Sequence, residues 1–202
     1  MLKRMDIPVV FLRRRPSPEL ELPFVDVDHY KGSCNAVEYL LSLGHREIGF
    51  IGMPDYSFTG GERFRGYVDT LKRHGIAPDP KAVVLDERTI RHGYLGMEKL
   101  AAGYPDMTAV FAANDMLGIG ALEWMAQHQW AVPERMSIVG FDNLEMTDLH
   151  WIKLTTVAQP RKEMGRKAAG LLMEMMAEDK RTAPSIVLET ELVIRQTCSE
   201  RL

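Results

Sequence analysis

Short apolar runs alternate with longer amphipathic segments along most of the chain, and this alternation constrains the fold more than any other feature. The runs expected to form strands are residues 8–12, 22–27, 48–52, 83–85, 108–113, 137–141, 154–158 and 186–197. The segments expected to form helices are residues 28–43, 64–75, 93–102, 115–128 and 160–178. Strands that alternate with helices of about 10–15 residues are typical of parallel sheets covered by helices on both faces. The pattern therefore predicts a doubly wound α/β protein.

Residues at the ends of the expected helices have structural explanations of their own. Gly44 and Gly75 follow two of the helices, where glycine readily adopts the left-handed conformation that closes a helix. Asp28 and Asp115 stand at two helix starts, where a carboxylate caps the first backbone amides. Pro160 suits the first turn of the last helix. We therefore interpret the two aspartates first as helix caps.

Charge and cysteine content exclude several classes of protein. The 202 residues include 25 Lys and Arg against 28 Asp and Glu, a net charge of −3, so no overall field attracts nucleic acid or an anionic membrane. Cys34 and Cys198 match no metal or redox spacing and are expected to be free thiols in a reducing compartment. No apolar run approaches the ~18 residues of a membrane helix, and the run near the N-terminus, interrupted by Pro8, is too short for a signal peptide. We expect a cytoplasmic protein with no metal and no other cofactor.

Polar side chains gather directly after the expected strands. They are Arg13; Asp55, Ser57 and Thr59; Asp86 and Arg88; Asn114 and Asp115; Asp142 and Asn143; Gln159; and, one turn into a helix, Arg63. Ligands of open parallel sheets bind beyond the carboxyl ends of the strands, where these groups converge. Carboxylates, amides and guanidinium groups, with Phe58, Phe141 and Trp151 to supply apolar faces, suit a small sugar-like or purine-like ligand. Asp142 is the strongest candidate because it has no helix to cap.

Motifs of catalysis are weak in this sequence. The dipeptide repeat Gly118-Ile119-Gly120 lies within an expected helix and lacks the third glycine of a dinucleotide-binding loop. The sequence contains neither a nucleophile elbow nor a P-loop. Its six histidines form no pair at the spacing of a zinc helix. We expect that the protein is not an enzyme.

Several blocks of sequence resemble one family in the same order. They are Val25–Asp28, Leu43–Gly52, Arg63–Tyr67, Thr108–Asp115, Pro133–Asn143, Leu154–Val157 and Arg195–Thr197. Together they are similar to the effector domain of LacI/GalR-type transcriptional regulators, over residues 5–198. The resemblance implies two Rossmann-like lobes with parallel sheets, of the type I periplasmic-binding-protein-like kind.

The resemblance also implies how the lobes are assembled. Residues 1–45 and 155–182 would form an N-terminal lobe, and residues 46–154 and 183–202 a C-terminal lobe. A complete member begins with a helix-turn-helix, a hinge and two further βα units, which this sequence does not include. The N-terminal lobe is therefore expected to be incomplete, with an open sheet edge and exposed apolar helix faces that favour self-association.

Residue by residue, the resemblance implies a ligand site and a dimer interface. The ligand-binding positions are Arg13, Ser57, Thr59, Arg63, Arg88, Asn114 and Asp142. The dimer-interface positions are Ile119, Leu122, His150 and Trp151. Three arginines around one crevice favour an anionic ligand, such as a sugar acid or a sugar phosphate.

The function that the resemblance implies is sensing. A sugar or sugar derivative would bind between the two lobes and change the DNA affinity of a headpiece outside this sequence, in a homodimer or higher oligomer. DNA would be contacted only through that headpiece, and no membrane is involved. Two alternatives stay open at this point: a solute-binding receptor of a transport system, and a sugar-processing enzyme.

Overall fold

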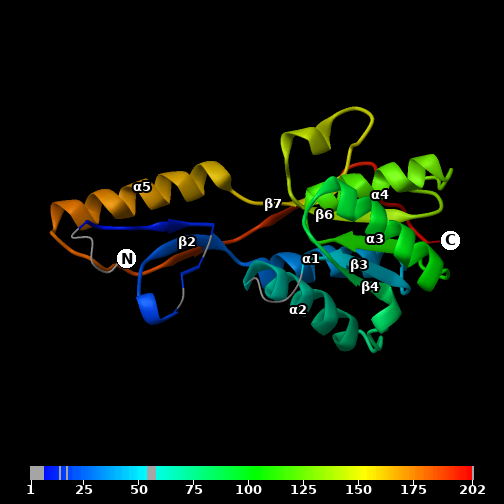
Figure 1. Cartoon of the computed structure of the whole chain (residues 1–202), viewed down its shortest axis with the longest axis horizontal. Helices are drawn as coiled ribbons and strands as arrows, with labels where there is room; N and C mark the ends of the chain where they lie inside the picture. The colour runs from blue at the N-terminus through cyan, green and yellow to red at the C-terminus, as the bar shows by residue number, and fades with distance from the viewer. Residues whose placement is uncertain (1–6, 14, 17, 54–57, 202) are drawn as a thin grey trace. The chain divides into compact units, whose positions relative to one another are not determined.

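The computed structural model describes the chain except for residues 1–6, 14, 17, 54–57 and 202, and it separates into two compact units. Unit 1 consists of residues 1–28 and 159–190, and unit 2 of residues 29–158 and 191–202. Both units combine helices with mostly parallel strands (Figure 1). The predicted α/β fold class is therefore confirmed.

Unit 2 is built on a six-stranded sheet in the order β4-β3-β5-β6-β7-β9. The strands are β3 (Ile48–Gly52), β4 (Val83–Leu85), β5 (Ala109–Ala112), β6 (Ser137–Asp142), β7 (Thr155–Ala158) and β9 (Glu191–Val193). The first five strands in this order are parallel, and β9 runs antiparallel to β7 at the edge. The carboxyl ends of the parallel strands therefore share one edge, as the site prediction requires.

Helices cover both faces of this sheet. They are α1 (His29–Ser42), α2 (Phe58–Arg73), α3 (Ile90–Gly103) and α4 (Asp115–Gln127), with short 3-10 turns η3 (Pro80–Ala82) and η4 (Glu145–Asp148). In Figure 1, α1 and α2 lie on one side of the strands and α3 and α4 on the other. Because strand side chains alternate between faces, Phe50 and Phe111 pack with α1 and α2, whereas Ile51 and Val110 pack with α3 and α4. Two fully buried cores result.

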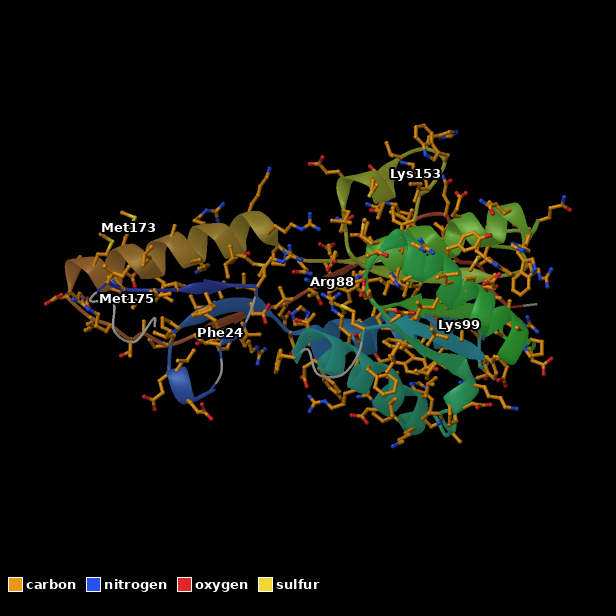
Figure 2. The ribbon with its side chains drawn as sticks, viewed as in Figure 1. Phe24, Arg88, Lys99, Lys153, Met173 and Met175 are labelled. Atoms are coloured by element: carbon orange, nitrogen blue, oxygen red, sulfur yellow. The ribbon has the colours of Figure 1, made fainter. Side chains whose placement is uncertain are left out.

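Unit 1 is a three-stranded parallel sheet with one helix. Its strands are β1 (Phe11–Leu12), β2 (Phe24–Val27) and β8 (Ile186–Leu188), its helix is α5 (Arg161–Ala177), and a 3-10 turn η2 (Pro18–Leu20) precedes β2. Val25 and Val27 form a small buried core with Met164 of α5. Figure 2 shows Met175 on the side of α5 that faces the strands and Met173 on the opposite side. Met175 is 2% exposed and Met173 is 69% exposed.

Large apolar side chains are exposed in unit 1, as the sequence predicted for an incomplete lobe. They are Ile7, Leu12, Met173, Met176 and Val187. Leu12 lies in β1, Val187 in β8, and the two methionines in α5, so the small core covers only part of the apolar surface of the unit. Self-association through this surface stays a prediction.

The units have other bounds than the predicted lobes, because residues 29–45 and 155–158 belong to unit 2 and residues 183–190 to unit 1; the lobes themselves stay a prediction. Helix α1 lies in unit 2, where it packs on α2. A Cβ atom added at Gly66 of α2 would lie 2.7 Å from the carbonyl oxygen of Tyr30 in α1, so the two backbones touch where glycine allows it. The segment 186–197, predicted as one strand, is divided between β8 of unit 1 and β9 of unit 2.

His45 links the start of β5 to the C-terminal segment of unit 2, and this contact gives a first testable prediction. Its Nδ1 lies 2.9 Å from the Thr108 hydroxyl, and its Nε2 lies 3.1 Å from the Ser199 carbonyl oxygen. Since that carbonyl can only accept, Nε2 carries the proton. Burial lowers the pKa of His45 below its usual 6.5. The unfolded chain therefore binds a proton first, and stability is lost as the pH falls below 6.5 towards the folded-state pKa.

We expect the substitution His45→Gln to remove this acid-side loss from the stability profile between pH 7 and 5. The exposed His74, which follows α2, supplies the control. Urea unfolding of wild type, H45Q and H74Q across this range measures the effect. Parallel profiles for wild type and H45Q would contradict the assignment.

None of the helices in the described part of the chain is long and apolar enough to cross a membrane.

Candidate functional site

Arg63 is the centre of a buried polar cluster in unit 2. Arg63 is only 2% exposed. Its guanidinium donates to the carbonyl oxygen of Ala113 through Nη1 and to Asp142 Oδ1, at 3.1 Å, through Nη2. The guanidinium also lies over the ring of Phe141, 3.7 Å from its centroid. The cation of α2 is thus fixed against the ends of β5 and β6, two neighbouring strands of the sheet.

His29, the first residue of α1, completes this cluster. Arg63 reaches His29 Nδ1 from both Nη2, at 3.2 Å, and Nε, at 3.4 Å. Arginine can only donate, so Nδ1 accepts and the histidine proton is on Nε2. His29 is 4% exposed and its ring lies 5.9 Å from that of Phe141. Sequence reasoning missed His29, although its place directly after the strand β2 and the cap candidate Asp28 was a signal.

Asp142 and Asn114 lie at the same edge of the sheet. Asp142 ends β6 with a φ of 119°, and its side chain remains 17% exposed while paired with Arg63. Asn114 follows β5 and is the N-cap of α4, because its Oδ1 accepts from the amide of Leu117 at 2.8 Å. Its Nδ2 lies 3.9 Å from the sulfur of Met53. The cap uses one lone pair of the amide oxygen, and the NH₂ group supplies the donors that Asn114 could offer to a ligand.

Asp115 is not the N-cap that the sequence suggested. It is the first residue of α4 and is fully buried. Its Oδ2 accepts from the amide of Leu144 at 2.7 Å, and its Oδ1 accepts from the Thr156 hydroxyl at 2.6 Å. The cap moves to the preceding asparagine because the aspartate carboxylate has tertiary partners on β7 and on the segment after β6.

Burial raises the pKa of Asp115 from 3.8 to about 7, against the opposing effect of its two hydrogen bonds. Asp142 raises this pKa further, and the guanidinium of Arg63 lowers it. A raised carboxyl pKa means that the folded state holds a proton which the unfolded state has released. The contribution to stability is therefore fully present below pH 3.8 and is lost as the pH rises to about 7.

We expect Asp115→Asn, a neutral mimic of the protonated form, to remove this loss. Wild type and D115N should be similar in stability near pH 4 and diverge in favour of D115N towards pH 8. Thermal unfolding at intervals across this range is the measurement, and Asp86→Asn, which neutralises a partly exposed carboxylate after β4, is the control. A constant difference between wild type and D115N at every pH would contradict the prediction.

The other predicted ligand residues are less closely gathered. Thr59 is half-buried in the first turn of α2, and Ser57 lies outside the described residues. Arg88 is exposed between β4 and α3 and is labelled in Figure 2. Arg13 belongs to unit 1, where it follows β1, is exposed and has a φ of 58°. The cluster therefore brings together Arg63 and Asp142, with Asn114 at the next strand end.

The aromatic residues expected to face a ligand differ in their surroundings. Phe141 is fully buried beneath Arg63 and packs in the core on the α1 and α2 face, so that expectation was wrong for Phe141. Phe58 is 44% exposed and Trp151 is 78% exposed. Phe141 thus supports the cation instead of presenting a face to a ligand.

The predicted dimer residues occupy two elements of unit 2. Ile119 and Leu122 are half-buried on α4, and Leu122 packs partly against the core on that face. His150 and Trp151 are exposed in the segment between β6 and β7. Figure 2 shows that Lys153 comes from the same segment. Their role in an interface stays a prediction.

Within the described residues, no group of three or more His, Cys, Asp or Glu side chains is arranged to hold a metal ion.

Comparison with known proteins assigns this fold to a class. Residues 37–198 match the family model of the periplasmic binding protein-like domain. The HTH-type transcriptional repressor CytR of Escherichia coli K12 is 36% identical over 193 residues, which are 96% of this chain and 57% of CytR. The chain thus spans little more than half the length of this curated relative.

Solved structures agree with the sequence comparison. The Escherichia coli transcriptional repressor AscG superimposes with a TM-score of 0.84 at 31% identity, over 98% of this chain and 72% of that one. The CelR–cellobiose complex, of another transcriptional regulator, gives a TM-score of 0.86 at 33% identity, over 93% of this chain and 58% of that one. The chain belongs to the LacI family of transcriptional regulators, to which a sugar-binding regulator of Escherichia coli, 30% identical over 99% of this chain and 71% of that one, also belongs. Its relatives are regulators and not enzymes, as the sequence predicted.

Proposed function

We propose that this chain senses a small polar effector, and that the Arg63–Asp142 pair at the carboxyl edge of the six-stranded sheet binds it. The observation that carries this proposal is the fixation of Arg63 by Asp142, His29 and the Ala113 carbonyl, with a partly exposed carboxylate left at the surface. A carboxylate accepts from hydroxyl groups and a guanidinium donates to them. The cellobiose complex of CelR supports a sugar as the class of ligand.

The charge of the cluster favours a neutral ligand over an anionic one. Asp142 balances the charge of Arg63, and His29 accepts a hydrogen bond in its neutral form, so the cluster as a whole carries no net charge. The anionic ligand expected from the sequence depends on Arg13 and Arg88 instead, and both of these are exposed. We therefore favour a neutral sugar or sugar derivative, and the ligand panel below tests both classes.

The activity of the longer protein is part of this proposal. The curated relatives extend well beyond the length that this chain covers. Units 1 and 2 would be its two lobes, and effector binding would change the affinity of a DNA-binding headpiece in the cytoplasm. A homodimer would form through Ile119, Leu122, His150 and Trp151.

Thermal unfolding in the presence of candidate ligands tests the proposed site. The panel contains neutral sugars (ribose and cellobiose), a sugar acid (glucuronate) and a sugar phosphate (glucose 6-phosphate). A ligand at 100 times its Kd stabilises the folded state by about 2.7 kcal/mol, so binding is visible as a raised Tm. We expect a neutral sugar to raise the Tm of wild type and of the control Asp106→Asn, whose carboxylate is exposed between α3 and β5, and to have no effect on Asp142→Asn.

The panel also identifies the ways in which the proposal fails. Stabilisation by glucuronate or glucose 6-phosphate alone would replace the neutral ligand with an anionic one. A ligand that stabilises Asp142→Asn as much as wild type would place the binding site elsewhere.

A further inference from the structure

Two consecutive residues at the end of β6 have a backbone conformation that side chains rarely adopt. Asp142 has a φ of 119° and Asn143 a φ of 50°. Residues other than glycine persist in such conformations only where their surroundings hold them there. The two residues join the carboxylate that pairs with Arg63 to the segment 144–154, which we call the β6–β7 loop. Side chains that hold this turn in place therefore connect the binding cluster to the loop.

Asp115 and Thr156 hold the turn from beneath. The amide of Leu144 donates to Asp115 Oδ2 at 2.7 Å. The amide of Asn143 donates to the hydroxyl oxygen of Thr156 at 3.4 Å. The same hydroxyl donates to Asp115 Oδ1 at 2.6 Å. Both amides that follow Asp142 thus end on one buried carboxylate–hydroxyl pair.

The Asp115 carboxylate also lies against the backbone of β6. A Cβ atom at Gly140, in the middle of β6, would lie 2.4 Å from Asp115 Oδ1. Asp115 therefore packs directly on the backbone of β6, two residues before the strained turn. Asp115 is fully buried, and Thr156 is fully buried as well.

Arg195 closes the loop from its other side. Its Nη2 donates to Asn143 Oδ1 at 2.7 Å, and its Nη1 donates to the Leu154 carbonyl oxygen at 2.7 Å. Within the loop, the Leu154 amide donates to the Thr147 carbonyl oxygen at 3.0 Å. The loop is therefore tied at both ends, while its tip exposes Leu149 and Trp151.

We propose that Asp115 is a positioning residue that couples the Arg63–Asp142 pair to the β6–β7 loop, through the strained turn and Thr156. This inference rests on the proposed function for the identity of the binding cluster. A ligand that engages the Asp142 carboxylate changes the balance between its bond to Arg63 and the conformation of the turn. Because the amides of the turn end on Asp115 and Thr156, that change alters how firmly the loop is held. The coupling is reciprocal, so the loop in turn affects the affinity of the cluster.

Hydrogen exchange of the loop amides in the unliganded chain tests the coupling. Asp142→Asn removes the charge that pairs with Arg63 and keeps the size and shape of the side chain. Thr156→Val removes the hydroxyl and keeps the shape of the side chain. We expect each substitution to speed exchange of the Leu144 and Leu154 amides about tenfold, without changing exchange of core amides in β5.

The double variant D142N/T156V decides the question. If both substitutions act through one connection, exchange in the double variant is also about tenfold faster than in wild type. Independent effects would multiply to about a hundredfold and would overturn the proposal. Unchanged exchange at the loop in D142N would overturn it too.

Three further variants separate coupling from general damage. Thr156→Ser restores the hydroxyl and should return loop exchange to the wild-type rate. Asp86→Asn removes a carboxylate at the end of β4, outside this network, and should leave the loop unchanged. If T156V fails to fold, Thr156→Ala, which also removes the hydroxyl, replaces it in the same double-variant scheme. Since these exchange rates are measured without ligand, a failure of the coupling proposal can be distinguished from a failure of the effector titration.

Discussion

An alanine at position 120 is expected to lower the free energy of unfolding of unit 2 by about 3 kcal/mol or more. Gly120 lies on α4 where this helix crosses α3. A Cβ atom there would stand 1.9 Å from the carbonyl oxygen of Ile90 and 2.7 Å from the amide nitrogen of Tyr94. Both are backbone atoms of α3, so the clash can be relieved only by moving one helix away from the other.

The crossing is equally tight when it is viewed from α3. A Cβ atom at Gly93 would lie 2.2 Å from the carbonyl oxygen of Leu117. In Gly118-Ile119-Gly120, whose spacing partly resembles a dinucleotide-binding loop, Gly120 therefore serves the packing of α4 on α3, and Gly118 faces Leu154 and Ala112. Separation of α3 from α4 would open the core that contains Leu117 and Met125.

Gly103, at the end of α3, supplies a matched control, since a Cβ atom there meets nothing within 4 Å. Gly103→Ala should change the free energy of unfolding by no more than about 1 kcal/mol, with alanine favoured. Urea unfolding followed by tryptophan fluorescence is the measurement, because Trp124, Trp130 and Trp151 all belong to unit 2. Equal stabilities of G120A and G103A would show that the helices do not cross at this contact.

The substitution Arg63→Met is expected to cost about 3 kcal/mol and to abolish effector binding. The methionine keeps the apolar length of the side chain over Phe141 but leaves Asp142, His29 and the Ala113 carbonyl without their donor. Breaking a buried pair costs about 3–5 kcal/mol, and the lower figure applies because Asp142 is partly exposed. Arg63→Lys keeps the charge but cannot reach three acceptors at once, so it should also lose most of the binding.

Arg65, on the same helix, is the control for this second prediction. Its exposed guanidinium pairs with Glu62 and lies over the ring of Tyr30, so Arg65→Met should cost no more than about 1 kcal/mol. Urea unfolding and the effector titration are measured on all three variants. Retained effector-induced stabilisation in folded R63M would exclude Arg63 from the site.

Local pattern predicted the order and type of most elements because each strand or helix here has its own apolar face. The alternation of Phe50 and Ile51 along β3 separates two cores, and both cores are found. The rule that ligands bind at strand ends placed Arg63, Asn114 and Asp142 at one edge without knowledge of any contact. The lobe bounds implied by the resemblance differ from the units at residues 29–45, where helix α1 packs on α2 at Gly66.

The misses in the site have a common physical cause. Asp115 has the composition and position of a helix cap, and only its tertiary partners, Leu144 and Thr156, assign it another role. His29 has no motif and acquires its role from the direction in which Arg63 extends. In both cases the deciding hydrogen bond joins residues far apart in sequence, and propensity or spacing carries no information about such a pair.

The order of synthesis gives the last strand of unit 2 a particular importance. β9 and the residues after it are made after residues 159–190 of unit 1, yet they complete the sheet of unit 2. Thr197 forms hydrogen bonds with Ile138 of β6 and with the amide of Thr155 in β7. Arg195 donates a hydrogen bond to the Leu154 carbonyl oxygen of the β6–β7 loop. During translation, β7 is therefore an open sheet edge until this segment has left the ribosome. A nascent chain stalled before residue 191 is expected to present that edge to chaperones. In such a chain Arg63 and Asp142 can already pair, whereas the β6–β7 loop lacks its hydrogen bonds to Arg195.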